Sequence, residues 1–120
     1  MKKLLIPLLL ISPFSVADWG DVYYCQMTNH STITLEGKRT DYILEKFQFK
    51  LDKAKKAMVY GSTGYFSEEK VPLIEGRSWP EQEVWHAEDN YSHAYFKEGK
   101  FLFSMIGSRM TSISANCDKF

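Results

Sequence analysis

Apolar and polar residues alternate along much of the chain, in short runs separated by turn residues. The run FQFKLD at residues 47–52 has an apolar side chain at every second position, and DVYYCQMT at residues 21–28 alternates in the same way. A period of two predicts strands with one buried face rather than helices. The segment RTDYILEKF at residues 39–47 has a partial helical spacing, but it leads directly into an alternating run, so we predict a strand or a single turn there.

The carboxyl-terminal half predicts a first hairpin around residues 89 and 90. Asp and Asn both tolerate a positive φ and suit a tight turn. A turn at Asp89-Asn90 would pair Trp85 with Ala94 and His86 with His93.

Two more hairpins follow with matching registers. A turn at Glu98-Gly99 would pair Phe96 with Phe101, and a longer loop over residues 106–110 would pair Phe103 with Ile113. The predicted core face of these hairpins is Trp85, Ala87, Ala94, Phe96, Phe101, Phe103 and Met105. The predicted outer face is Val84, His86, Glu88, Tyr91, His93, Tyr95, Leu102 and Ser104. A shift of one residue would move the whole apolar set to water, so the agreement between the registers supports them.

The strand pattern therefore predicts an all-β fold. It is a single antiparallel meander sheet or a small closed barrel of about six to eight strands. A loop at residues 53–56 would place Leu51 opposite Met58, and residues 71–74 form a short edge strand because Pro72 is unsuited to a central one. The long segment between residues 61 and 83 is rich in Gly, Ser, Pro and Glu, and we expect a loop that could bind a partner.

The first 17 residues predict a cleaved signal peptide. Lys2 and Lys3 precede an apolar run, and Ser15-Val16-Ala17 is a small-x-small cleavage site. The apolar run is shorter than the roughly 20 residues of a membrane helix. We therefore expect residues 18–120 to form one exported domain, periplasmic or extracellular, with no transmembrane segment after cleavage. The chain has 15 basic and 15 acidic residues; removing Lys2 and Lys3 leaves 13 against 15, with no basic patch for nucleic acid.

The two cysteines, Cys25 and Cys117, lie near the two ends of the predicted domain. An even number in an exported protein favours a disulfide, although two free thiols or a metal-binding pair are the alternatives. On the strand pattern both cysteines face the core, so a Cys25–Cys117 bond would join the first strand to the last. It would close a loop of about 90 residues, which contributes on the order of 4 kcal/mol in the chain-entropy model.

The histidines are the main candidates for chemistry. With His86 and His93 directly opposed, their Cβ atoms would be roughly 5 Å apart, and Glu88 on the same face could add an oxygen ligand for Zn or Cu. Two ordinary surface histidines are the alternative, and we expect no other cofactor. Nucleophile and phosphate-loop motifs are missing from the sequence, so it favours a protein that is not an enzyme.

A binding module is the function that the composition favours. The aromatic residues predicted outside the core mark a partner or ligand surface, or a surface that another segment covers. The candidate binding residues are Trp79, His86, Tyr91, His93 and Tyr95. The expected ligand is a protein, a glycan or a small apolar molecule at the cell envelope. The alternatives are a metal-dependent or hydrolytic enzyme that uses His86 and His93, and a subunit of an envelope or virion assembly.

The two ends of the domain carry a resemblance to a known family. With YYC at residues 23–25 and SANC at residues 114–117, the layout is similar to periplasmic inhibitors of C-type lysozyme. The resemblance implies a small exported antiparallel barrel with a cysteine bridge near the last strand, and inhibition of lysozyme as a further alternative function. The chain lacks the family's S-G-A-R-Y and W-x-K-G segments, and YGSTGYF at residues 60–66 matches the first only loosely.

Overall fold

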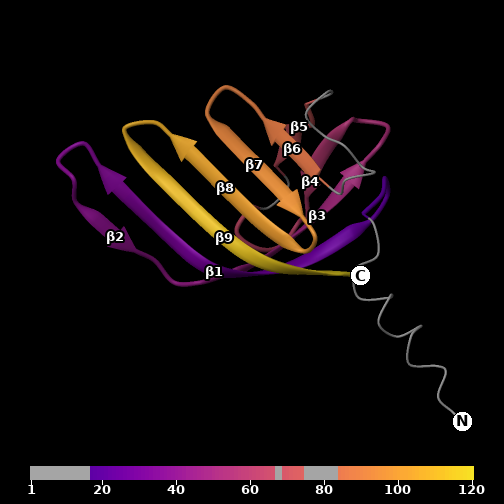
Figure 1. Cartoon of the computed structure of the whole chain (residues 1–120), viewed down its shortest axis with the longest axis horizontal. Helices are drawn as coiled ribbons and strands as arrows, with labels where there is room; N and C mark the ends of the chain where they lie inside the picture. The colour runs from indigo at the N-terminus through magenta and orange to yellow at the C-terminus, as the bar shows by residue number, and fades with distance from the viewer. Residues whose placement is uncertain (1–16, 67–68, 75–83) are drawn as a thin grey trace, which may run out of the picture.

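The computed structural model describes residues 17–66, 69–74 and 84–120, and all regular structure within them is β-strand (Figure 1). The strands are β1 (Val22–Thr34), β2 (Arg39–Asp41), β3 (Lys46–Asp52), β4 (Ala57–Tyr60), β5 (Lys70–Pro72), β6 (Val84–Glu88), β7 (Ser92–Lys97), β8 (Lys100–Ile106) and β9 (Arg109–Lys119). The predicted all-β class is confirmed. The described residues contain no helix with the length and apolar character that a membrane crossing requires.

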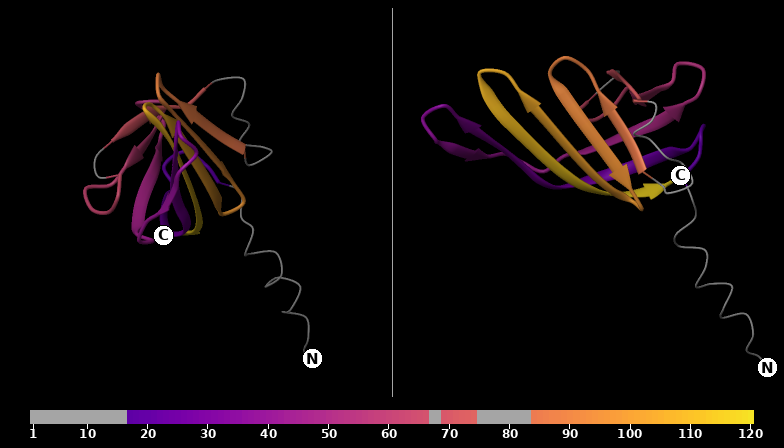
Figure 2. Two further views of the ribbon diagram at one scale, coloured as in Figure 1. Left: turned by 90° about the vertical axis from the view of Figure 1, so that its left-hand side faces the viewer. Right: turned by 45° about the horizontal axis from the view of Figure 1, so that its top comes forward.

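The strands form one antiparallel sheet that curls into a nearly closed barrel. Its order is β5-β4-β3-β1-β9-β8-β7-β6, and β2 pairs with β1 outside this path. The two outer strands of the path approach each other where Leu73 bridges to Ala87 and the N–H of Ile74 donates to the C=O of His86 at 2.9 Å. Figure 2 shows the sheet curving round on itself. Near closure leaves few unpaired edge groups.

Most predicted registers are confirmed. Leu51 lies opposite Met58, and Phe103 lies opposite Ile113, although β8 and β9 extend further than predicted and leave a shorter loop. Glu98 and Gly99 both have positive φ, 48° and 79°, which is the type I′ hairpin conformation. That turn places Phe96 opposite Phe101, as predicted.

The predicted pairing in the β6–β7 hairpin is wrong by two residues. His86 lies opposite Tyr95, and His93 lies opposite Glu88. The turn is one position further along than predicted because Asp89 precedes it, with the N–H of Asp89 donating to the C=O of Ser92 at 3.0 Å. Asp is favoured at the first position of such a turn. Since two residues are one full strand period, each side chain keeps its predicted face.

The barrel interior is filled mainly by aromatic side chains. Tyr23 stacks on Phe49 with ring centroids 5.4 Å apart, and Phe49 meets Phe96 edge-on at 5.1 Å. Trp85 is fully buried against the edge of Trp19. Burial of each large apolar side chain contributes about 1.5–3 kcal/mol. The predicted core face is confirmed except for Met105, which is partly exposed because it lies at one end of the barrel.

The first and last strands lie side by side and are joined covalently. Cys25 lies opposite Cys117, and the two form the predicted disulfide. Both side chains are buried and face the core, which is the arrangement that the alternation indicates. The barrel and its bridge also match what the resemblance to lysozyme inhibitors implies for the fold.

A β-bulge in β1 changes which residues face the interior. The pairing of β1 with β9 shifts register between Met27 and Asn29. Before the shift, Tyr23 and Met27 are buried in the core, whereas after it His30 and Thr32 are buried and Ile33 is exposed. A bulge adds one residue to one strand, so the inward positions change from odd to even numbers. The interior is therefore apolar at one end and more polar at the other.

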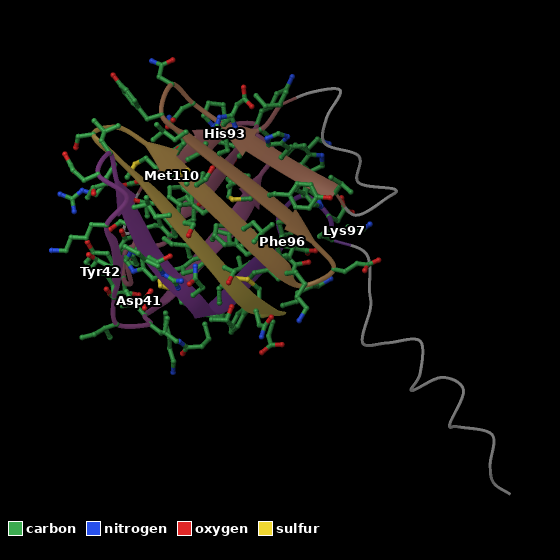
Figure 3. All side chains as sticks on the ribbon, turned by 60° about the vertical axis from the view of Figure 1, so that its left-hand side comes forward. Asp41, Tyr42, His93, Phe96, Lys97 and Met110 are labelled. Atoms are coloured by element: carbon green, nitrogen blue, oxygen red, sulfur yellow. A yellow bond between two sulfur atoms is a disulfide. The ribbon has the colours of Figure 1, made fainter. Side chains whose placement is uncertain are left out.

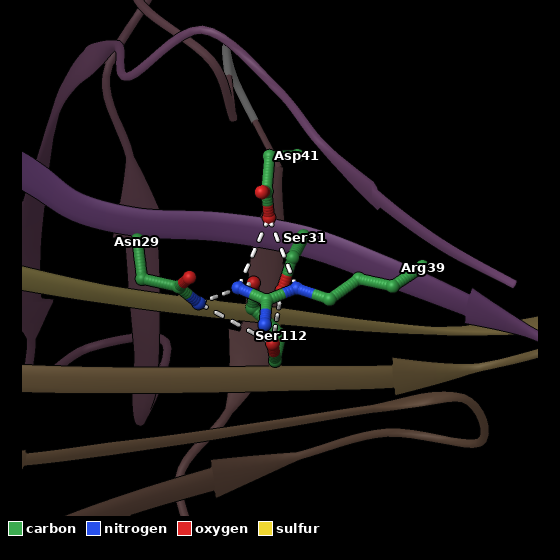
Figure 4. A network of polar contacts seen from close by, with 5 residues as sticks. All are labelled: Asn29, Ser31, Arg39, Asp41 and Ser112. Atoms are coloured by element: carbon green, nitrogen blue, oxygen red, sulfur yellow. Dashed lines mark hydrogen bonds and ion pairs between the residues drawn. The ribbon is translucent and has the colours of Figure 1, made fainter.

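Polar side chains of β1, β2 and β9 lie close together where β2 pairs with β1 (Figure 4). Ser31 lies opposite Asp41 on one side and Ser112 on the other. The hydroxyls of Ser31 and Ser112 are 3.1 Å apart, and the Asn29 amide donates to the C=O of Ser112 at 3.3 Å. Arg39 pairs with Asp41 at 3.1 Å. The contacts of Ser112 therefore join β1 to β9, and the Arg39–Asp41 pair lies within β2.

Two weaker predictions are only partly met. The segment at residues 39–47 contains β2 and the start of β3, with no regular element between residues 42 and 45. The predicted edge strand at residues 71–74 is β5 at Lys70–Pro72, which lies at one end of the strand order.

The predicted signal peptide falls almost wholly on residues 1–16, which lie outside the described residues, as does part of the predicted binding loop.

Replacing both cysteines by alanine should lower the free energy of unfolding by about 4 kcal/mol, because the bridge closes a long loop in the unfolded chain. Urea denaturation of the Cys25→Ala/Cys117→Ala variant against the oxidised protein measures the difference. Reduced wild-type protein is the control and should match the variant. Equal stability of the oxidised protein and the variant would contradict this role.

Candidate functional site

A cavity of about 660 Å³ opens at the end of the barrel where β1 finishes. Its walls come from the second half of β1, the segment after β2, the β8–β9 turn and the loops that face them. The lining residues are His30, Thr32, Tyr42, Ile43, Glu45, Tyr65, Tyr91, Met105, Ile106, Gly107, Ser108, Arg109 and Thr111. We call this the mouth cavity. The bulge in β1 turns His30 and Thr32 toward this cavity.

His30 is the most unusual residue of the mouth cavity. Its side chain is held between two rings, with centroids 4.8 Å from Tyr42 and 4.9 Å from Tyr65, and the residue is only 7% exposed. The buried Nδ1 atom has no hydrogen-bond partner among the described residues. A buried polar atom left without a partner costs about 1–3 kcal/mol. A buried polar atom without a partner calls for an explanation, of which a functional role is one.

Tyr42 links the wall of the mouth cavity to its rim. Its hydroxyl is 3.3 Å from the Thr32 hydroxyl and accepts a hydrogen bond from Arg109 at 3.4 Å. The hydrogen bond with Thr32 lowers the pKa of Tyr42, and Arg109 acts in the same direction. No described carboxylate is close enough to form an ion pair with Arg109. The guanidinium therefore offers its donors to a ligand at the rim.

The rest of the rim is apolar and exposed. Ile43 is 82% exposed, Tyr91 68% and Ile106 62%. Deeper in the cavity, burial raises the pKa of Tyr65, and the negative charge of Glu45 raises it further, so Tyr65 stays a neutral phenol. The mouth cavity thus combines aromatic walls, a largely apolar rim, the Arg109 cation and the Glu45 carboxylate.

A second group of side chains lies on the outer face of the β6–β7 hairpin. Glu88 Oε1 is 3.6 Å from His86 Nε2 and 3.3 Å from His93 Nδ1. One potential ligand atom from each of the three residues lies within 4.8 Å of the others. The sequence predicted these three residues as a possible metal site, and the corrected register brings them together with Glu88 between the histidines.

The turn after β6 is held by Asp89. Its Oδ1 accepts hydrogen bonds from the backbone N–H of Tyr91 at 2.9 Å, from the N–H of Ser92 at 2.8 Å and from the Ser92 hydroxyl at 3.0 Å. The bond from the Tyr91 N–H is the largest cause of the lowered pKa of the Asp89 carboxyl. These bonds fix the register that places Glu88 opposite His93.

The remaining predicted binding residues lie in different places. Tyr91 is on the rim of the mouth cavity, whereas Tyr95 lies on the outer face opposite His86. Figure 3 shows Tyr42 and His93 well separated on the molecule. Trp79 lies outside the described residues.

The sequence interpretation missed His30 and Arg109, because His30 faces inward only through the bulge. The one sequence feature that indicates the bulge is the loss of apolar alternation after Met27.

Comparisons with protein-family models, with curated proteins and with solved structures found no match to this chain.

The Asp89→Ala variant should lose about 1 kcal/mol of folding stability, since three hydrogen bonds in one turn lose their acceptor. Thermal or urea unfolding measures the effect. The Asn90→Ala variant is the matched control, because the Asn90 side chain forms no hydrogen bond with a described residue, and it should stay within about 0.5 kcal/mol of wild type. Equal losses in the two variants would show that Asp89 does not hold the turn.

Proposed function

We propose that this chain is an exported binding protein, rather than an enzyme, and that its ligand is a small amphipathic anion bound in the mouth cavity. The observation that carries the proposal is an aromatic-walled cavity of about 660 Å³ with an arginine at its rim that no described carboxylate neutralises. Export is supported by the signal-like amino-terminal sequence and is compatible with the disulfide.

The size and lining of the mouth cavity support a small ligand. Pockets for drug-sized molecules range from about 300 to 1,000 Å³ and are mostly apolar, with a few polar groups that fix orientation. Here the rings of His30, Tyr42 and Tyr65 form the wall, and the aliphatic side chains of Ile43 and Ile106 border the opening. An apolar or flat portion of a ligand would pack between them.

The charges favour an anionic head group over a neutral sugar. Arg109 presents planar N–H donors that suit a carboxylate or sulfonate, and Tyr42 beside it adds a hydroxyl. Glu45 is the only carboxylate among the described lining residues. Thr32, Thr111 and the tyrosine hydroxyls of the wall could also pair with sugar hydroxyls. A glycan is the alternative that the test below separates.

The test uses 8-anilinonaphthalene-1-sulfonate, a fluorescent aromatic anion, titrated into the purified folded protein. We expect saturable binding of one molecule per chain, displaced by dodecanoate but not by maltotetraose. Arg109→Ala should weaken binding by about tenfold, the usual loss for a charged hydrogen bond. Thr111→Phe should abolish binding, because Thr111 is buried in the wall and the larger ring would fill the space.

Arg39→Ala is the matched control, because Arg39 is an exposed arginine on the outer face that does not line the mouth cavity. It should bind the probe as wild type does. Near-ultraviolet circular dichroism of each variant verifies that the aromatic core is intact. Probe binding that is unchanged in both Arg109→Ala and Thr111→Phe would overturn the proposal, and displacement by the sugar alone would favour a glycan.

A further inference from the structure

The outer face of the β6–β7 hairpin carries a site that is independent of the mouth cavity. His86 and Glu88 are two residues apart on β6, so their side chains lie on the same face. His93 comes from β7, directly opposite Glu88. The three side chains are partly exposed, at 23% for His86, 27% for Glu88 and 55% for His93. Solvent therefore reaches a site whose backbone is fixed by a strand pair.

From this geometry we propose that His86, Glu88 and His93 bind one Zn²⁺ ion on the outer surface of the barrel. Zinc bonds of about 2.0–2.1 Å at tetrahedral angles place neighbouring ligand atoms about 3.3 Å apart. The Glu88 oxygen is 3.3 Å from the His93 nitrogen and 3.6 Å from the His86 nitrogen. All three pairs are within 4.8 Å, so a small rotation of the exposed His93 side chain completes the triangle.

The chemistry of the three groups suits zinc better than a hard cation. Two imidazole nitrogens and one carboxylate oxygen are a common zinc ligand set, whereas Ca²⁺ and Mg²⁺ prefer oxygen ligands throughout. The carboxylate also offsets part of the charge of the metal. Copper would compete for the same ligands, since it binds more tightly than zinc to most nitrogen sites.

The three ligands found among the described residues leave one tetrahedral position of the zinc open. His86 and His93 border a shallow groove of about 480 Å³ on the outer face, with Tyr95, Leu102 and Ser104 among its other residues. Water or a ligand group lying in this groove would occupy the open position. Among the described residues the proposed zinc site has three ligands, whereas in a closed structural site the protein supplies all four.

The test is isothermal titration of Zn²⁺ into the folded protein, prepared without a polyhistidine tag. We expect one ion per chain with a dissociation constant in the micromolar range. His86→Ala, His93→Ala and Glu88→Gln should each weaken binding by about tenfold or more. Glu98→Gln is the matched control on the next hairpin turn and should bind zinc as wild type does. The mouth variant Thr111→Phe should also keep zinc binding, which separates this proposal from the proposed function.

The imidazole resonances of the three histidines give a second readout. Zinc should shift the signals of His86 and His93, whereas those of the buried His30 serve as an internal reference. Circular dichroism of the substituted proteins verifies that each is folded. The proposal is overturned by the absence of saturable binding in a large excess of zinc. It is equally overturned by binding that persists undiminished in His86→Ala and His93→Ala.

Discussion

The pairing of the first strand with the last is the constraint on which the rest of this barrel depends. β1 and β9 are the two longest strands, and their ladder runs from Tyr23–Lys119 to Thr34–Arg109. Contacts so distant in sequence carry a large entropy cost of loop closure, which the disulfide removes for the oxidised chain. Once this pair is set, the hairpins on either side follow by local turns. The two outer strands then meet across the Leu73–Ala87 bridge.

Local alternation and turn residues made much of the fold predictable. In the β7–β8 hairpin, Glu98-Gly99 and the phenylalanines around it specify the same register, because a two-residue turn allows only one pairing of the aromatic faces. The inward direction of Cys25 and Cys117 followed from the same period. The sequence was therefore sufficient to predict the near closure of the sheet and the disulfide.

The sequence did not predict the regions in which a side-chain hydrogen bond or a bulge overrides the alternation of apolar and polar residues. At Asp89 a carboxylate selects the start of the turn, and the pairing moves by two residues while the faces stay the same. After Met27 the bulge reverses which residues face inward, and no residue type in that stretch marks its position. His30 was therefore not among the candidate residues, and the mouth cavity around it was not foreseen.

The bulge in β1 also divides the strand into a half that packs in the barrel interior and a half that borders the mouth cavity. On one side of it, Tyr23 and Met27 belong to the packed aromatic interior; on the other, His30 and Thr32 border an open cavity. Substitutions of His30 or Thr32 change the cavity wall and leave the positions of Tyr23 and Met27 in the core unaltered in sequence. One inserted residue thus gives the chain a region in which the lining of a cavity can diverge in evolution while Tyr23 and Met27 stay in the packed interior.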